Sequence, residues 1–148
     1  MTGKKDDNCI LCTNHVYAII EDSSKNLRIG TGYGLNFLNR KTGRFTYYHS
    51  NPRNKNSISF NDIKALAFDD KNNLWIATNN GGLNYLDIAN KQFHHFKHDP
   101  NDSTSLANNK VYNLLFDSYK NLWVISSENG YLSPTELQML PHNENKFI

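Results

Sequence analysis

The stretch DDKNNLWIATNNGGLNYLD, residues 69–87, indicates the fold because the chain repeats it. A close copy, DSYKNLWVISSENGYL, occupies residues 117–132, and a fainter one, DSSKNLRIGTGYGLNFLN, occupies residues 22–39. Residues of many types recur in the same phase, 47 or 48 positions apart, and a fixed period of about 45 residues indicates a repeat architecture. The anchors of the repeat include Asp22, Asp69 and Asp117; Leu27, Leu74 and Leu122; Trp75 and Trp123; and Asn14, Asn61 and Asn109.

Each unit reads as a series of short strands joined by tight turns. In the middle unit, IKALAF (63–68) is almost wholly apolar, as in a buried strand, and the turn cluster DDKNN separates it from LWIAT (74–78). LNYLDI (83–88) and QFHHFKH (92–98) follow after NNGG and ANK. Turns this short join antiparallel neighbours, so we expect four antiparallel strands per unit. No window shows an apolar stripe at helical spacing, which argues against helical repeats.

Four antiparallel strands in a repeat of this length are typical of one blade of a β-propeller. We therefore predict an all-β fold of tandem blades, a partial or open propeller in a single domain, residues 1–148. The blades are expected at about residues 16–50, 63–98 and 111–148, the third incomplete or degenerate. The recurring tryptophans are expected to pack between blades, and the recurring aspartates to cap the first hairpin of each blade rather than to hold a metal.

The motifs NLWIAT, GLNYLD, VYAIIED and HDPNDSTSLANNKVYNLLFD resemble the two-component regulator propeller repeat. The resemblance covers about residues 11–132 in three tandem copies. It implies a periplasmic sensor domain of a hybrid two-component histidine kinase, of the kind found in polysaccharide-degrading gut Bacteroidetes. It further implies an oligosaccharide as the ligand, and a signal passed to a kinase that these 148 residues lack.

Departures from that repeat pattern affect packing. Arg28 stands where the other two units have tryptophan, so we expect altered packing in the first blade. The third unit loses the GLNYLD pattern, and NKF (145–147) echoes NKQF (90–93) at the threshold of a twelfth strand. The resemblance implies a sensor with many more repeats, so we expect this chain to be a fragment, a truncated reading frame or a degenerate copy. Because the terminal blades would expose apolar faces and unpaired edges, we expect self-association, for instance of two copies in a six-bladed ring.

A ligand is expected at one end of the blades. In a four-stranded meander, the turn after the second strand and the connector after the fourth emerge at the same end. The turns at 32–34, 79–82 and 127–130 therefore share a face with the connectors 50–61 and 98–109. Their amides, and an aromatic ring, suit the hydroxyls and rings of sugars. The candidate ligand-binding residues are Tyr33, Asn79, Asn80 and Glu128, and the alternative is that each is a solvated turn residue.

The sequence gives little support for catalysis, a cofactor or a metal site, so we expect none of them. His94 and His95 would point to opposite faces of a strand, and His98 would lie about 13 Å from His94 at ~3.3 Å per residue, too far for a shared zinc ion. Cys9 and Cys12 form one C-x-x-C, without the second pair that a structural zinc site needs.

Composition and charge bear on other classes of function. A net charge of +2, without a long run of Lys or Arg, does not predict nucleic-acid binding. No apolar stretch reaches the roughly 20 residues that span a bilayer, and no signal peptide is visible. Three alternatives to a sensor stay open: a protein-binding scaffold, a copy without a function, and an enzyme like the streptogramin lyases, for which His15 is the histidine near the start of an inner strand.

Overall fold

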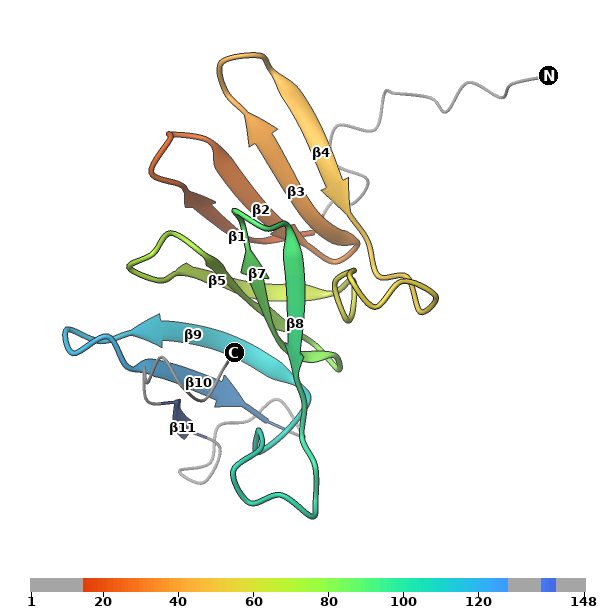
Figure 1. The fold of residues 1–148 in the computed structure, drawn as a ribbon, viewed down its shortest axis with the longest axis vertical. Coiled ribbons are helices and arrows are strands. Elements are labelled where there is room, and N and C mark those ends of the chain that lie inside the picture. Colours follow the sequence, from red (N-terminus) through yellow and green to blue (C-terminus); the bar gives the residue numbers. More distant parts are fainter. Residues whose placement is uncertain (1–14, 128–136, 141–148) are drawn as a thin grey trace.

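The computed structural model describes residues 15–127 and 137–140, which form strands and turns and no helix that could cross a membrane (Figure 1). The strands lie in three antiparallel sheets, blades 1 to 3, which follow one another in chain order as an open arc. The predicted propeller blades are thereby confirmed. Blade 1 consists of β1 (Val16–Glu21), β2 (Leu27–Thr31), β3 (Gly34–Asn39) and β4 (Arg44–Tyr48); blade 2 of β5 (Ile63–Phe68), β6 (Leu74–Thr78), β7 (Gly82–Asp87) and β8 (Gln92–Phe96); and blade 3 of β9 (Val111–Phe116), β10 (Leu122–Ser126) and β11 (Leu137–Leu140).

The strands of blade 2 lie where the sequence pattern predicts them, apart from shifts at some ends. β5 and β6 have the predicted bounds, whereas β7 spans Gly82–Asp87 and β8 ends at Phe96, two residues early. His98 belongs to the following connector because its backbone N–H donates to Oδ1 of Asn109 (2.8 Å) instead of to a neighbouring strand. The expected twelfth strand at 145–147 lies outside the described residues, as do Cys9, Cys12 and Asn14.

The first turn of each blade is closed by the repeated aspartate. Oδ1 of Asp69 accepts hydrogen bonds from the backbone N–H groups of Lys71 (3.0 Å) and Asn73 (2.7 Å). Asp22 and Asp117 accept the same pair of bonds in their own turns, at 2.9 to 3.0 Å. A carboxylate that binds the backbone N–H groups of its own turn stabilises that turn, so these residues act as the expected caps.

The repeated asparagine closes each connector in the same way. Oδ1 of Asn61 accepts a hydrogen bond from the backbone N–H of Ser50 (2.7 Å), and Asn109 makes the equivalent bond to His98 one period later (2.8 Å). Each bond joins the start of a connector to the residues just before the next inner strand. The connectors are therefore ordered loops that return the chain from the outer edge of one blade to the inner strand of the next.

An apolar core fills each of the two junctions between blades. Because burying apolar surface is the dominant favourable term in folding, these cores hold the blades together. Trp75 is 5% exposed and lies in the second junction, where its ring stacks on Phe96 at 5.6 Å, as predicted for a packing residue. The first core contains Leu35, Ile58, Ile63, Leu74, Ile76 and Leu86, and the second contains Ala65, Trp75, Ala77, Leu83, Leu106, Val111, Leu114, Leu122, Val124 and Leu140.

Small residues let neighbouring blades approach closely. We call the face of a blade that points toward the next blade its trailing face. On the trailing face of blade 1, Gly30 pairs with Ala18, and a Cβ on Gly30 would lie 2.6 Å from Cγ2 of Ile63 in blade 2. Real Cβ atoms essentially never come so close to a neighbour, so the spacing of this junction requires glycine at position 30.

Arg28 replaces tryptophan in blade 1 without leaving the core. It is 6% exposed, its guanidinium lies 3.9 Å from the centroid of the Phe37 ring, and Nη2 lies 3.5 Å from Oδ2 of Asp22. Burial lowers the pKa of Arg28, opposed by nearby acidic groups. In blade 3, the indole N–H of Trp123 donates to Oδ2 of Asp117 (2.9 Å), so the arginine occupies the same place and meets the same carboxylate.

Candidate ligand-binding site

Turns and connectors are joined at the predicted ligand-binding end of the blades. In the β6–β7 turn, the N–H of Asn79 donates to the carbonyl of Asp62 (2.9 Å). The N–H groups of Asn80 and Gly82 both donate to the carbonyl of Asn109 (3.1 and 2.8 Å). The turn of blade 2 is therefore bonded to the ends of both connectors. We call this end of the molecule the loop face; it comprises the turns 32–33 and 79–81 and the connectors 49–62 and 97–110.

Tyr33 is the predicted residue best placed to meet a ligand. It is 57% exposed at the tip of the β2–β3 turn, and its ring meets His49 edge to face at 5.4 Å. Its backbone N–H donates to Oγ1 of Thr31 (3.1 Å), and the Thr31 hydroxyl donates to the carbonyl of Gly34 (2.9 Å). The turn thus holds an exposed phenol ring on a well-fixed backbone.

The two predicted asparagines differ in their surroundings. The Asn79 side-chain amide donates to Oδ2 of Asp62 (2.9 Å), so part of this side chain is used within the protein. Asn80 is exposed and has a φ of 100°, which fits the alternative interpretation of a turn residue and also leaves its amide open to a ligand. Glu128 lies outside the described residues.

Sequence reasoning missed a row of side chains at the starts of the inner strands β1 and β5. The Lys64 ammonium lies 3.7 Å from the centroid of the Tyr17 ring and 2.9 Å from Oδ1 of Asp62. The other oxygen of Asp62 accepts the bond from Asn79, and the His15 ring stacks against Tyr17 at 6.3 Å. This inner row is therefore continuous from blade 1 to the β6–β7 turn of blade 2.

The inner row could have been predicted from the repeat period. Positions one period apart occupy the same place on successive blades, so their side chains can meet at a junction even when they differ in type, as Tyr17 and Lys64 do. The sequence analysis looked for residues that recur, whereas these positions change from blade to blade. The two sets of positions are His15, Asp62 and Lys110, and Tyr17, Lys64 and Tyr112.

The Lys64–Asp62 pair sets the charge of the inner row. Burial opposes the positive charge of Lys64, but the hydrogen bond and the attraction from the Asp62 carboxylate outweigh it, so the pKa of Lys64 is raised. Their side chains are 17% and 24% exposed, and the two charges offset each other at neutral pH. Two nearby elements carry exposed aromatic rings: Tyr17, in the inner row, is 47% exposed, and Phe60, which lies against Gly81 in the β6–β7 turn, is 39% exposed. Aromatic rings beside hydrogen-bonding groups suit a neutral polar ligand.

His94 and His95 of β8 and His98 of the second connector each contact a different neighbour. Across residues 15–127 and 137–140, no three His, Cys, Asp or Glu side chains gather as ligands for a metal ion. The His94 ring lies 5.8 Å from that of Tyr85, His95 Nε2 lies 2.7 Å from the carbonyl oxygen of Ser57, and His98 Nδ1 lies 2.7 Å from that of Leu106.

The fold and the loop face define a segment of a β-propeller, and its repeats match a known family. Residues 57–80 and 105–128 each match the pattern of the two-component regulator propeller. Each match runs from the connector serine, through the inner strand, to the turn after the second strand. Two segments of the chain therefore match the repeat of that family.

Solved structures of similar fold include extracellular domains of hybrid two-component systems. The extracellular domain of the system BT3049 from B. thetaiotaomicron is 28% identical, with a TM-score of 0.69, and the match covers 76% of this chain and 16% of that one. The domain of BT4673 from the same organism is 28% identical, with a TM-score of 0.61, covering 76% and 15%. This chain thus spans about a sixth of their length. No curated protein matches it.

An enzyme shares the fold at low identity. Virginiamycin B lyase from Staphylococcus aureus is 11% identical, with a TM-score of 0.54, and the match covers 90% of this chain and 43% of the lyase. Identity at this level shows the fold alone. His15, the histidine of the enzyme alternative, stacks on Tyr17 in the inner row.

Proposed function

We propose that this chain is a ligand-sensing segment of a periplasmic propeller in a hybrid two-component regulator. Its ligand is an oligosaccharide bound at the loop face and the adjoining inner row, and a histidine kinase carries the signal onward. The two matches to the two-component regulator propeller repeat and the likeness to extracellular domains of hybrid two-component systems support the sensing role and the location.

The observation that favours a sugar is the pairing of exposed rings with fixed polar groups on one face. Tyr17, Tyr33 and Phe60 are each more than a third exposed. The exposed Asn80, next to the Gly81 that Phe60 lies against, offers an amide, and the Lys64 ammonium lies over the Tyr17 ring. A pyranose presents an apolar ring face and a rim of hydroxyls, so it can stack on an aromatic ring while its hydroxyls bind amide and ammonium groups.

Calorimetric titration of the 148-residue chain with a panel of plant and host oligosaccharides tests the proposal. For a sugar that binds, Tyr33→Ala and Tyr17→Ala should each weaken binding about tenfold, or 1.4 kcal/mol. Tyr119→Ala is the matched control because Tyr119 is 84% exposed in the turn at the opposite end of blade 3. Equal effects of all three variants would contradict the proposed site. A protein partner captured through Tyr33, with no sugar bound, would favour the scaffold alternative.

A further inference from the structure

The β6–β7 turn on the loop face contains an Asn–Gly pair, Asn80 and Gly81. The N–H groups of Asn80 and Gly82 both donate to the carbonyl of Asn109 (3.1 and 2.8 Å), and the carbonyl of Gly81 accepts the hydroxyl of Ser59 (2.8 Å). Within residues 15–127 and 137–140, no hydrogen bond engages the Asn80 side chain or the Gly81 N–H. The turn is therefore held firmly by its neighbours and still presents an exposed amide next to a backbone nitrogen without a partner.

The structure requires glycine at position 81 and favours asparagine at position 80. A Cβ on Gly81 would lie 2.5 Å from Cβ of Phe60 and 2.5 Å from Oγ of Ser59, closer than real Cβ atoms come to a neighbour. Asn80 has a φ of 100°, and asparagine adopts a positive φ more readily than most residues other than glycine. Packing and backbone conformation thus place this particular pair on the loop face.

An exposed asparagine followed by glycine can lose its amide without an enzyme. The backbone nitrogen of Gly81 attacks Cγ of Asn80, and the new N–C bond closes a succinimide ring. The bond from Cγ to the side-chain nitrogen breaks, and that nitrogen leaves as ammonia with the proton of the Gly81 N–H. Water then opens the ring at either of its carbonyls, which leaves aspartate or isoaspartate at position 80. Glycine favours the attack because it has no side chain to crowd its nitrogen.

The conformation of the turn is compatible with closure of that ring. A succinimide holds ψ of its residue at about −120°, the value of the first central residue of a type II′ turn, where φ is positive. Asn80 already has a positive φ. Because the Gly81 N–H donates to none of the described residues, no hydrogen bond to them has to break before the nitrogen attacks.

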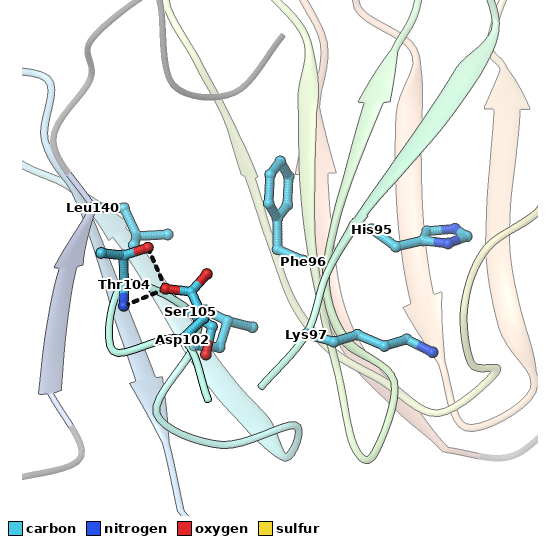
Figure 2. Close-up of a pocket in the computed structure, with 8 residues that line it drawn as sticks. His95, Phe96, Lys97, Asp102, Thr104, Ser105 and Leu140 are labelled. Atoms are coloured by element: carbon cyan, nitrogen blue, oxygen red, sulfur yellow. Dashed lines mark hydrogen bonds between the residues drawn. The ribbon is translucent and has the colours of Figure 1, made fainter. Parts of the chain in front are cut away.

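Asn101, in the second connector, is equally exposed but is followed by a backbone nitrogen that is already bonded. The N–H of Asp102 donates to the carbonyl of Asp99 (3.1 Å). The Asp102 carboxylate in turn accepts hydrogen bonds from the backbone N–H (2.8 Å) and the hydroxyl (2.7 Å) of Thr104 (Figure 2). Both the side chain of Asp102 and its engaged N–H oppose an attack on Asn101, so this residue serves as an internal control.

Two further asparagines have side-chain amides that the protein itself holds. The side chain of Asn56, in the first connector, accepts a hydrogen bond from the N–H of Phe93 (2.8 Å) and donates to the carbonyl of Lys91 (3.1 Å). The amide of Asn79, in the same turn as Asn80, donates to Oδ2 of Asp62 (2.9 Å). The other Asn–Gly pair of the chain, at 129–130, lies outside the described residues.

We propose that Asn80–Gly81 is a site of spontaneous deamidation that converts an amide of the loop face into a carboxylate. The conversion lowers the net charge of the chain, +2, by one unit. The isoaspartate form also adds a methylene to the main chain, which changes the spacing of the two N–H groups that bind the Asn109 carbonyl. Solvent water is the only co-reactant, so the reaction proceeds whether or not a sugar binds.

Peptide mapping by mass spectrometry tests the site on the folded 148-residue chain, incubated at neutral and at mildly alkaline pH. We expect the mass gain of an amide-to-acid conversion at position 80, with both aspartate and isoaspartate as products. Asn80 should convert about tenfold or more faster than Asn79 and Asn101, because among these three it alone precedes glycine. The rate should rise with pH, because the attacking nitrogen has to lose its proton. Asn80→Gln keeps an amide but should stop the conversion, since the longer side chain has to close a larger ring.

Three results would overturn the proposal. The first is an intact Asn80 in the folded chain that converts only after unfolding in urea, because the folded turn would then prevent ring closure. The second is conversion of Asn79 or Asn101 as fast as that of Asn80. The third is aspartate without isoaspartate at position 80, because direct hydrolysis of the amide, unlike a succinimide, gives aspartate alone.

Discussion

Equivalent positions carry small residues at the two junctions between blades and larger residues on the trailing face of blade 3. In blades 1 and 2 these positions carry the small pairs Gly30–Ala18 and Ala77–Ala65. In blade 3 the equivalent pair is Ile125–Asn113. The β-branched residue of the next blade, Ile63 or Val111, lies against the small pair in the two junctions. A further blade at the same spacing would meet the larger pair of blade 3.

The trailing face of blade 3 is therefore apolar and yet unsuited to packing against a further blade. Leu115 is 63% exposed and Met139 is 44% exposed on the trailing face of blade 3. This exposed apolar surface supports the expectation that the chain self-associates, which stays a proposal. A six-bladed ring of two copies would bring Val16, the counterpart of Ile63, against Ile125, and the bulk of that side chain opposes it.

The largest change in the free energy of unfolding is expected at Leu114, one of two neighbouring leucines of β9. Leu114 is 8% exposed and faces blade 2, whereas Leu115 faces away. Leu114→Ala should lower the free energy of unfolding by about 3 kcal/mol because it leaves a cavity in the junction. Leu115→Ala should change it by less than about 0.5 kcal/mol. Urea denaturation followed by tryptophan fluorescence measures both, and similar losses would show that the trailing face of blade 3 is covered.

The next effect comes from giving blade 1 the bulk found in blade 3. Gly30→Ile should lower the free energy of unfolding by about 2 kcal/mol, because the new side chain overpacks the junction against Ile63. Thr46→Ile is the matched control at an exposed position of β4. The same denaturation measurement compares them, and an unchanged stability for Gly30→Ile would mean that blades 1 and 2 can separate slightly without loss.

Restoring the small pair on blade 3 should increase the self-association of the chain. The double variant Asn113→Ala/Ile125→Gly restores the small pair on blade 3, so a second copy can place its Val16 against this face. We expect its average mass by light scattering to rise with concentration more steeply than that of the wild-type chain. A wild-type chain that already forms a discrete dimer, with no change in the variant, would contradict the role assigned to Ile125.

The smallest effect concerns the pH dependence of stability that comes from the Asp117–Trp123 hydrogen bond. The hydrogen bond from the Trp123 indole, with those from Asn121 and the turn backbone, lowers the pKa of Asp117. A carboxyl whose pKa is lower in the folded chain stabilises it above the unfolded pKa of about 3.9, and that contribution is lost as pH falls through the folded value. Asp117→Asn should therefore lower Tm slightly at pH 7 and have less effect at pH 3. Thermal melts at both pH values check this.

The sequence predicts the blades because the period, the turn aspartates and the apolar strands all recur. Strand ends are less certain: β8 stops at Phe96 because His98 bonds to Asn109, a contact that spacing does not reveal. For the candidate site, the turn position of Tyr33 follows from the strand count. The inner row does not, because Tyr17, Lys64 and Asp62 meet only when adjacent blades are stacked.

The two hydrogen bonds between the Asn56 side chain and the β8 region also affect how such repeats can be recombined. Asn56 binds the outer strand of the blade that follows it in sequence, so residues 49–62 belong with blade 2. A crossover placed between β4 and residue 49 would move blade 2 together with Asn56. A crossover placed just before β5 would separate Asn56 from the strand that it binds. Duplication by whole modules is therefore expected to be tolerated best when the breakpoint falls after an outer strand.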